Sequence, residues 1–204
     1  IRRNGHRTLV EALRQVPDMY VGRINSGSWI AGARGLTGSS LTATRYLVLV
    51  DGRLVYDPLL STTFWDTVDV PLPDIDRIEV IRGPGATLWG VNAMNGVINI
   101  ITRRAADTQG TLLQAGIGSN DEAGLLVRHG ATTGLGTAWR VWAKYARHGD
   151  FENAAGDSIV DQWATLRGGF RIDGQWRDDI RYTLQGHAYT HPKAMESVLL
   201  PVAL

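Results

Sequence analysis

The spacing of apolar residues divides the chain into two parts with different periodicities. Up to about Arg104, short apolar runs are separated by turns rich in glycine and proline, which is typical of a mixed domain of helix and short strands. From about Gly110 onward, longer segments alternate apolar and polar residues, which predicts antiparallel strands with one face of each kind. We therefore predict two domains, residues 1–106 and residues 107–204.

One helix and several strands are expected in the first part. Thr8 and Glu11 have the spacing of a capping box, and the apolar residues that follow form one helical face that ends at Pro17. Residues 46–50 and 53–56 are apolar runs joined by Asp-Gly, a pair that readily adopts the positive φ angles of a tight hairpin turn. Further strands are expected at residues 75–81 and 97–102.

The second part contains five alternating segments. The last one places Ile180, Tyr182 and Leu184 on one face and Arg181 and Gln185 on the other. Segments of about ten residues with this alternation are typical of strands that cross an outer membrane, with apolar side chains toward lipid and polar ones toward the lumen. A soluble sandwich with one solvated face has a similar pattern. The five segments are expected at residues 111–118, 122–132, 137–148, 160–172 and 178–190.

Five strands are too few to close a membrane barrel, because bacterial single-chain barrels need about eight or more. An open edge in lipid leaves backbone groups unsatisfied. Either the chain is a fragment of a larger protein, or its strands belong to a soluble sheet. Ile1 begins inside a region predicted to be ordered and has no signal peptide before it, so we expect the true N-terminus to lie upstream.

Three runs in the first part carry a family resemblance. They are residues 47–53 (Leu-Val-Leu-Val-Asp-Gly-Arg), residues 73–86, which end in Ile-Arg-Gly-Pro-Gly-Ala, and residues 88–102, which begin with Leu-Trp-Gly. In this order and spacing they closely resemble the plug domain of TonB-dependent receptors, and the resemblance spans residues 1–104. Trp89 stands where the family commonly has Tyr, which keeps a large amphipathic ring. The motif residues that the resemblance marks as structural are Arg34, Gly35, Asp51, Gly52, Gly83, Pro84, Gly90, Asn95 and Gly96.

The resemblance implies an α+β plug domain followed by antiparallel strands of a transmembrane β-barrel, located in the bacterial outer membrane and present here as a fragment. Receptors of this family take up a scarce nutrient, such as a ferric siderophore or vitamin B12, and draw energy from the inner membrane through TonB. A segment called the TonB box lies N-terminal to the plug in the family, and we expect it upstream of Ile1. The implied partners are TonB, a ferric siderophore or cobalamin-type ligand, and outer-membrane lipid.

Charged residues on the strand expected at 75–81 and just beyond it are candidates for contact with the barrel wall. Charges removed from bulk water need partners. By resemblance, Glu79 and Arg82 join Arg and Glu residues of the wall, and Arg77 is placed to contribute as well. The alternative is that these side chains pair with each other on a solvated strand.

Ligand contact is expected in the polar loops at the plug apex, as the resemblance implies. The candidate stretches are residues 25–29, 36–44 and 61–65. Trp29, Phe64 and Trp65 have rings that could stack on a ligand, and they could equally pack on the barrel wall. The sequence of these loops does not identify the ligand.

Composition narrows the function classes further. The net charge is only +1, so no overall field attracts nucleic acid. The chain contains no cysteine, which excludes disulfides, thiolate metal sites and a cysteine nucleophile. His187 and His191 on one strand would lie about 13 Å apart, too far to share a metal ion. We therefore expect neither a metal nor another cofactor.

Two function classes remain, a transporter and a soluble binding module. No set of nucleophile, base and orienting group can be assembled, so we expect no enzyme activity. A transporter places Val141, Tyr145 and Leu184 against lipid, whereas a soluble periplasmic binding module that reuses a plug-like domain must bury them against a second sheet. The sequence offers no second sheet with matching apolar faces, which favours the transporter.

Overall fold

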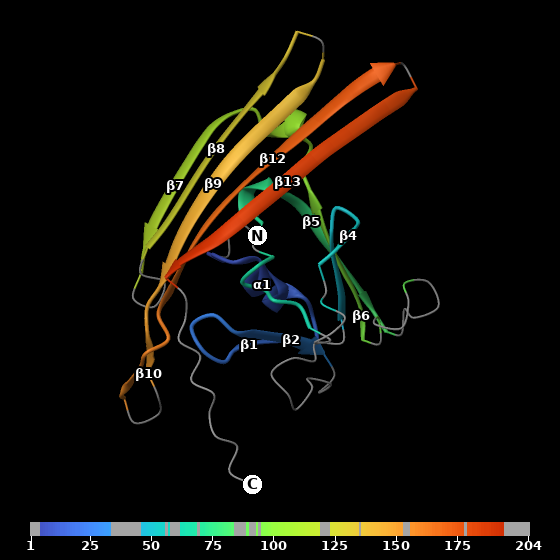
Figure 1. Ribbon diagram of the computed structural model, residues 1–204. Coiled ribbons are helices and arrows are strands. Elements are labelled where there is room, and N and C mark those ends of the chain that lie inside the picture. The colour runs from blue at the N-terminus through green and yellow to red at the C-terminus, as the bar shows by residue number, and fades with distance from the viewer. Residues whose placement is uncertain are drawn as a thin grey trace. The chain divides into compact units, whose positions relative to one another are not determined.

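The computed structural model describes residues 5–33, 46–55, 57, 62–68, 70–83, 89, 93, 95–118, 123–134, 136–152, 156–177 and 179–193. By its contacts the chain forms two compact units, which are described separately (Figure 1). The first unit comprises Ile1–Ile24 and Ser28–Arg103, and the second comprises Asn25–Gly27 and Arg104–Leu204. Within the described ranges, no helix is long and apolar enough to cross a membrane.

The first unit begins with a short capped helix, α1 (Leu9–Ala12), which continues as one 3-10 turn, η2 (Leu13–Gln15). Thr8 Oγ1 accepts a hydrogen bond from the Glu11 amide, and the Glu11 side chain accepts one from the Thr8 amide. The apolar side chains of α1 are buried. The predicted helix and its capping box are confirmed, although the last turn tightens to 3-10 geometry.

Two small sheets complete the first unit. Strands β1 (Met19–Arg23) and β2 (Trp29–Ala33) form an antiparallel hairpin that the apolar pattern did not predict. The other sheet has the strand order β4-β3-β6-β5, in which β3 and β6 run parallel. Its strands are β3 (Tyr46–Val50), β4 (Arg53–Leu54), β5 (Ile75–Arg82), which follows the 3-10 turn η3 (Leu72–Asp74), and β6 (Gly96–Thr102).

The core of the first unit covers both faces of the central strand β3. All five of its residues are buried, which explains why the sequence reads as an unbroken apolar run and does not alternate. Tyr46, Val48 and Val50 join the main cluster with Leu9 and Leu13 of the helical segment. The side chains on the opposite face of β3 form a second cluster, which contains Leu47, Leu49, Ala93 and Val97.

Three residues in this sheet and its hairpin turn have positive φ angles. Asp51 and Gly52 have φ angles of 49° and 78°, so the Asp-Gly pair forms the predicted hairpin turn between β3 and β4. The Asp51 carboxylate also accepts the amide and the hydroxyl of Thr102, each at 2.8 Å. Gly96 has a φ of 138°, and a Cβ atom there would collide with the carbonyl oxygen of Ile81. Only glycine fits position 96.

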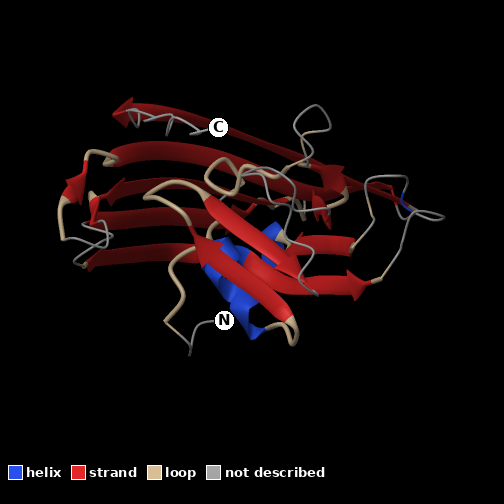
Figure 2. Cartoon of the chain, turned by 90° about the horizontal axis from the view of Figure 1, so that it is seen from below, coloured by secondary structure: helices blue, strands red, loops and turns tan. Residues whose placement is uncertain are grey.

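The second unit is built on five long antiparallel strands in the order β13-β12-β9-β8-β7 (Figures 1 and 2). Consecutive long strands pair with each other, which gives an up-and-down meander. A small hairpin of β10 (Phe151–Glu152) and β11 (Ser158–Ile159) lies in the connection between β9 and β12. The five predicted strands are confirmed as β7 (Gly110–Ile117), β8 (Ala123–Thr132), β9 (Ala138–His148), β12 (Trp163–Arg177) and β13 (Ile180–Lys193).

This five-stranded sheet has one apolar face and one polar face. The register places Phe170 beside Val141, and the alternation of side chains puts Arg167 and Arg171 on the opposite face from Phe170. The predicted alternation is therefore present in the folded sheet. The large apolar side chains that remain exposed on the apolar face are Leu113, Ile117, Leu125, Val127, Val141, Leu166, Phe170, Trp176, Ile180, Tyr182 and Leu184.

Candidate functional site

A 3-10 turn, η4 (Ala105–Thr108), leads from β6 into the five-stranded sheet. Arg103 is the last residue whose contacts place it in the first unit, and Arg104 begins the second. The domain boundary expected after residue 106 stays a prediction. The Arg103 amide donates to the Asp74 carbonyl oxygen at 2.8 Å, and its Nε donates to the Ile75 carbonyl oxygen at 3.4 Å, both in the first unit. Residue 103 is therefore tied to one unit, and η4 belongs to the other.

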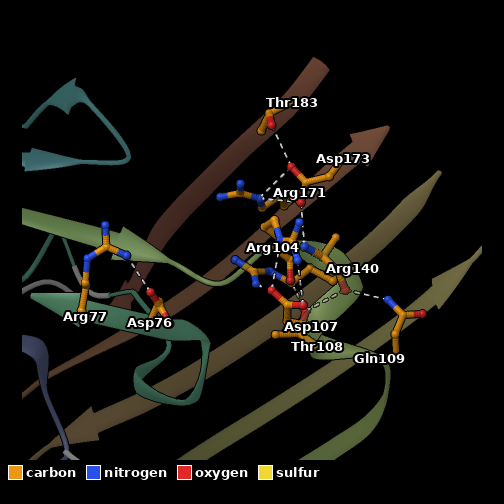
Figure 3. A network of polar contacts seen from close by, with 11 residues as sticks. Asp76, Arg77, Arg104, Asp107, Thr108, Gln109, Arg140, Arg171, Asp173 and Thr183 are labelled. Carbon is orange, nitrogen blue, oxygen red and sulfur yellow. Dashed lines mark hydrogen bonds and ion pairs between the residues drawn. The ribbon is translucent and has the colours of Figure 1, made fainter. Parts of the chain in front are cut away.

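Asp173 of β12 is the main partner of η4 (Figure 3). Its carboxylate accepts the Ala105 amide at 2.6 Å, Arg171 Nε at 2.8 Å and the Thr183 hydroxyl of β13 at 2.7 Å. The Arg171 and Asp173 side chains are only 12% and 16% exposed, so the ion pair is shielded from water. Hydrogen bonds to charged groups in such surroundings are the stronger ones. Asp173 thus joins η4 to two strands at once.

The other end of η4 packs against β8 and β9. A Cβ atom at Gly130 would lie 2.5 Å from the Thr108 carbonyl oxygen, so glycine is required for this close approach. Arg140 Nη1 donates to Thr108 Oγ1 at 3.4 Å, and the Thr132 hydroxyl donates to Gln109 Oε1 at 3.0 Å. These contacts come from the polar face of the sheet, as do those of Asp173. The turn is therefore held by three strands, β8, β9 and β12.

Strand β5 carries the charged residues expected to face a barrel wall. Arg77 donates to Glu79 Oε1 and to Asp76 Oδ2, each at 2.8 Å (Figure 3 shows the second pair). Asn99 of β6 donates to the other Glu79 oxygen at 3.2 Å. The hydrogen bonds from Arg77 and then Asn99 hold the pKa of Glu79 below its ordinary value. All three charged side chains are substantially exposed, so these ion pairs add little to stability.

Arg82 lies at the end of the same strand and contacts the segment after η2. Its Nη1 lies 3.2 Å from Asp18 Oδ2 and donates to the Pro17 carbonyl oxygen at 3.3 Å. Arg77 and Glu79 pair with each other, as in the alternative of a solvated strand, whereas Arg82 pairs with Asp18 outside β5. Local pairs do not prevent further contacts by exposed side chains, and the wall contacts of Arg77, Glu79 and Arg82 stay a prediction.

Five of the structural motif residues lie in the described part of the chain. Asp51 and Gly52 form the turn, and Gly96 makes the close approach to β5 given above. The Gly83 amide donates to the Asn95 carbonyl oxygen at 3.0 Å, which joins the two ends of the segment between them. The remaining motif residues, Arg34, Gly35, Pro84 and Gly90, lie outside the described residues.

The three candidate ligand-binding rings differ in accessibility. Trp29 is half-buried, and the guanidinium groups of Arg14 and Arg23 lie 5.7 and 5.1 Å from its ring centroid. Trp65 is part of the main core cluster. Phe64 is 42% exposed, so it is the most accessible of the three rings. Ligand contact by these residues stays a prediction, and the candidate stretch at residues 36–44 lies outside the described residues.

His148 and His191 of the five-stranded sheet contact aromatic rings. His148 stacks on Trp163 with ring centroids 4.4 Å apart, and His191 lies 5.8 Å from the same indole. In the described ranges, no group of three or more histidine, cysteine, aspartate or glutamate side chains is placed to hold a metal ion. That His187 and His191 do not share a metal stays a prediction.

Comparison with known families decides the identity of the first unit. Residues 1–97 match the family model described as the TonB-dependent receptor plug domain. The chain carries the plug domain of a TonB-dependent receptor. The receptor chain is 36% identical over 128 residues to the vitamin B12 transporter BtuB of Vibrio cholerae serotype O1 and 31% identical over 118 residues to that of Vibrio vulnificus. These matches cover 63% and 56% of this chain and 20% and 18% of the relatives, so the chain spans about a fifth of their length.

Solved structures show the same fold across both units of the receptor chain. The FrpB iron transporter from Neisseria meningitidis aligns with a TM-score of 0.69 at 20% identity, covering 91% of this chain and 29% of that chain. The unliganded ferric citrate transporter FecA aligns with a TM-score of 0.68 at 22% identity, covering 94% of this chain and 30% of that chain. The expected fold, a plug domain followed by antiparallel barrel strands, is thus confirmed. The receptor chain is an outer-membrane protein.

Sequence reasoning missed the residues that hold η4. Asp173 continues the polar face that Arg167 and Arg171 begin, but the expected strand ended at residue 172. Extending the alternation by one residue would have placed Asp173 beside Arg171 on that face. Gly130 carried no comparable signal, because its close neighbour Thr108 lies in a turn that no local pattern connects with β8.

Proposed function

We propose that this chain supplies the plug and the first wall strands of a receptor that takes up a scarce nutrient, such as a ferric siderophore or vitamin B12. TonB is proposed to supply the energy. The observation that carries the proposal is the exposed apolar face of the sheet that follows the plug domain. Eleven large apolar side chains on one face exceed what a soluble surface normally leaves open, and a barrel strand presents such a face to lipid.

Strand lengths support a membrane-spanning role. Strands β8 and β9 contain 10 and 11 residues. A tilted strand needs about 9–11 residues to cross the hydrocarbon core. Strands β12 and β13, with 15 and 14 residues, are long enough to extend beyond it. The same sheet can therefore span the bilayer and project past it.

The polar face carries positive charges in register. Arg140 stands opposite Arg171, and Lys144 stands opposite Arg167, on adjacent strands. Like charges placed directly opposite each other are destabilising unless counter-charges lie nearby. Asp173 is such a counter-charge for Arg171, with 2.8 Å between the two side chains. The contact of Arg77, Glu79 and Arg82 with a barrel wall is proposed on the family resemblance.

The ligand class rests on the relatives, and the site on the accessible aromatic side chain. The curated relatives are vitamin B12 transporters, and the matched structures include iron and ferric citrate transporters. In this chain, Phe64 is the exposed candidate for stacking on a ligand, with Trp29 and Trp65 less accessible. The chain is proposed to act as a transporter and not as an enzyme.

Uptake measurements test this function. Cells that express the full-length receptor would be given radiolabelled cyanocobalamin and, separately, ferric catecholate, ferric hydroxamate and ferric citrate complexes. Accumulation of one of these in cells with TonB, and its loss in otherwise identical cells without TonB, is the expected result. Equal accumulation of every compound with and without TonB would contradict the proposal.

A further inference from the structure

The connection between β1 and β2 makes its contacts with the second unit, although the two strands belong to the first. Asn25–Gly27 belong to the second unit, although the residues on both sides of them belong to the first. This connection is part of the stretch at residues 25–29 that the family resemblance marks for ligand contact. Its anchoring within the second unit therefore affects how that loop is presented.

Ser26 is the anchored residue of this loop. It is completely buried, and its amide donates to Asp161 Oδ2 at 2.7 Å. Its hydroxyl donates to the backbone carbonyl oxygen of the same residue, Asp161. Two donors of Ser26 thus bind one residue, one through its side chain and one through its main chain. The Gly27 amide donates to Asn25 Oδ1 at 3.1 Å, which tightens the loop around this anchor.

Asp161 is itself held in place by the connection between β9 and β12. Its amide and that of Gln162 both donate to Asp150 Oδ1, at 3.0 and 2.8 Å. Its second carboxylate oxygen accepts the Phe151 amide at 2.8 Å. The β9–β12 connection therefore restrains the Asp161 carboxylate independently of Ser26.

The Asp161 carboxylate is 3% exposed, and its described hydrogen-bond donors are the backbone amides of Ser26 and Phe151. A buried carboxylate is stable only when its oxygens are satisfied by hydrogen bonds. Releasing Ser26 would leave one oxygen without its donor, which opposes opening of the loop. A side chain with only one acceptor atom could not hold both amides.

From this geometry we propose that Asp161 is a positioning residue that latches the Asn25–Gly27 loop in the conformation that receives the ligand. The role in ligand reception rests on the proposed transport function, whereas the latch itself does not. A loop held before binding loses less conformational freedom when a ligand arrives. The latch thus favours rapid and selective binding without touching the ligand itself.

Thiol labelling of Ser26→Cys in the full-length receptor tests the latch. The 204 residues contain no cysteine, so the new thiol is the sole one in this region, and the substitution keeps the backbone bond to Asp161. With Asp161 present, the buried thiol should react slowly with a maleimide. Asp161→Ala should raise the rate by about tenfold or more, because a hydrogen bond to a charged group is worth that much. Asp161→Asn should raise it less, since one acceptor oxygen remains.

Glu152→Gln is the matched control, because Glu152 is an exposed carboxylate on β10 in the same connection. It should leave the labelling rate unchanged. Heat-dependent gel mobility reports whether each variant assembles. If Asp161→Ala does not assemble, the labelling rate of Asp161→Asn tests the latch. Rates that are equal with and without the Asp161 carboxylate would overturn the latch. Because no ligand is used, failure of the latch is separable from failure of the transport proposal.

Discussion

The substitution Asp173→Ala is expected to release η4 from the sheet. It removes the acceptor of the Ala105 amide and leaves the shielded Arg171 guanidinium without its carboxylate. Removing one partner of a fully buried ion pair costs about 3–5 kcal/mol. Since water reaches part of this pair, whose side chains are 12% and 16% exposed, we expect a local cost of about 2 kcal/mol. Asp173→Asn keeps the volume and one acceptor oxygen, so its cost should be about 1 kcal/mol.

Limited proteolysis measures this opening directly, because trypsin can cleave after Arg104 only when η4 is released from the sheet. When closing is fast, the cleavage rate follows the population of the open form. A cost of about 2 kcal/mol then corresponds to about a thirtyfold faster cleavage. Asp179→Asn, an exposed change in the turn between β12 and β13, is the control and should have no effect. Equal cleavage rates for Asp173→Ala and the unsubstituted receptor would refute the reasoning.

Three further predictions follow from other parts of the chain. The Glu79 carboxyl group, followed by NMR of its carboxyl carbon, should titrate below the ordinary glutamate pKa, because Arg77 donates a hydrogen bond to its Oε1. The contribution of this group to stability is present above the ordinary pKa and is lost as pH falls through the lowered one. Gly96→Ala should destabilise the plug by about 2 kcal/mol or more, through overlap with β5 and a strained φ, as measured by urea unfolding. Leu184→Lys should cost about 2–4 kcal/mol if the site lies at mid-bilayer, and should reduce the folded receptor recovered from outer membranes.

Each of these predictions has a matched control. Arg77→Gln should return the Glu79 carboxyl toward its ordinary pKa, and an unchanged titration would contradict the assigned cause. Gly116→Ala meets no atom within 4 Å, so it should be tolerated where Gly96→Ala is not. Gln185→Lys places the same charge on the polar face, and equal losses for it and Leu184→Lys would contradict the assignment of the two faces.

The long strands of the second unit were predictable because one periodicity governs each of them. Ile180 through Leu184 alternates without interruption, and the folded strand keeps that alternation in its register with β12. The Asp51-Gly52 turn was equally predictable, since few residue pairs adopt two consecutive positive φ angles. In both cases the determining interaction lies within a few residues along the chain.

Other features could not be predicted, because the interactions that determine them join residues far apart in sequence. They are the β1–β2 hairpin and the hydrogen bonds that hold η4 and Ser26. Strand β1 has a glycine and mixed polarity, and it is stabilised by a core that includes residues far away in sequence. Asp161 and Ser26 are 135 residues apart, so no local pattern connects them. The pairing of Arg77 within β5 was an open alternative, because charges two residues apart on a strand can meet each other or a partner across the interface.

The central claim is that the chain belongs to a closed receptor barrel in the outer membrane. The measurement is gel mobility of the native protein from isolated outer membranes, with and without boiling, detected by an antibody against the plug. We predict that it fractionates with the outer membrane, runs far above the mass of 204 residues after boiling, and shifts its mobility when unboiled. A band near the mass of 204 residues in the soluble periplasm, with no shift on heating, would contradict the account and support a soluble binding module.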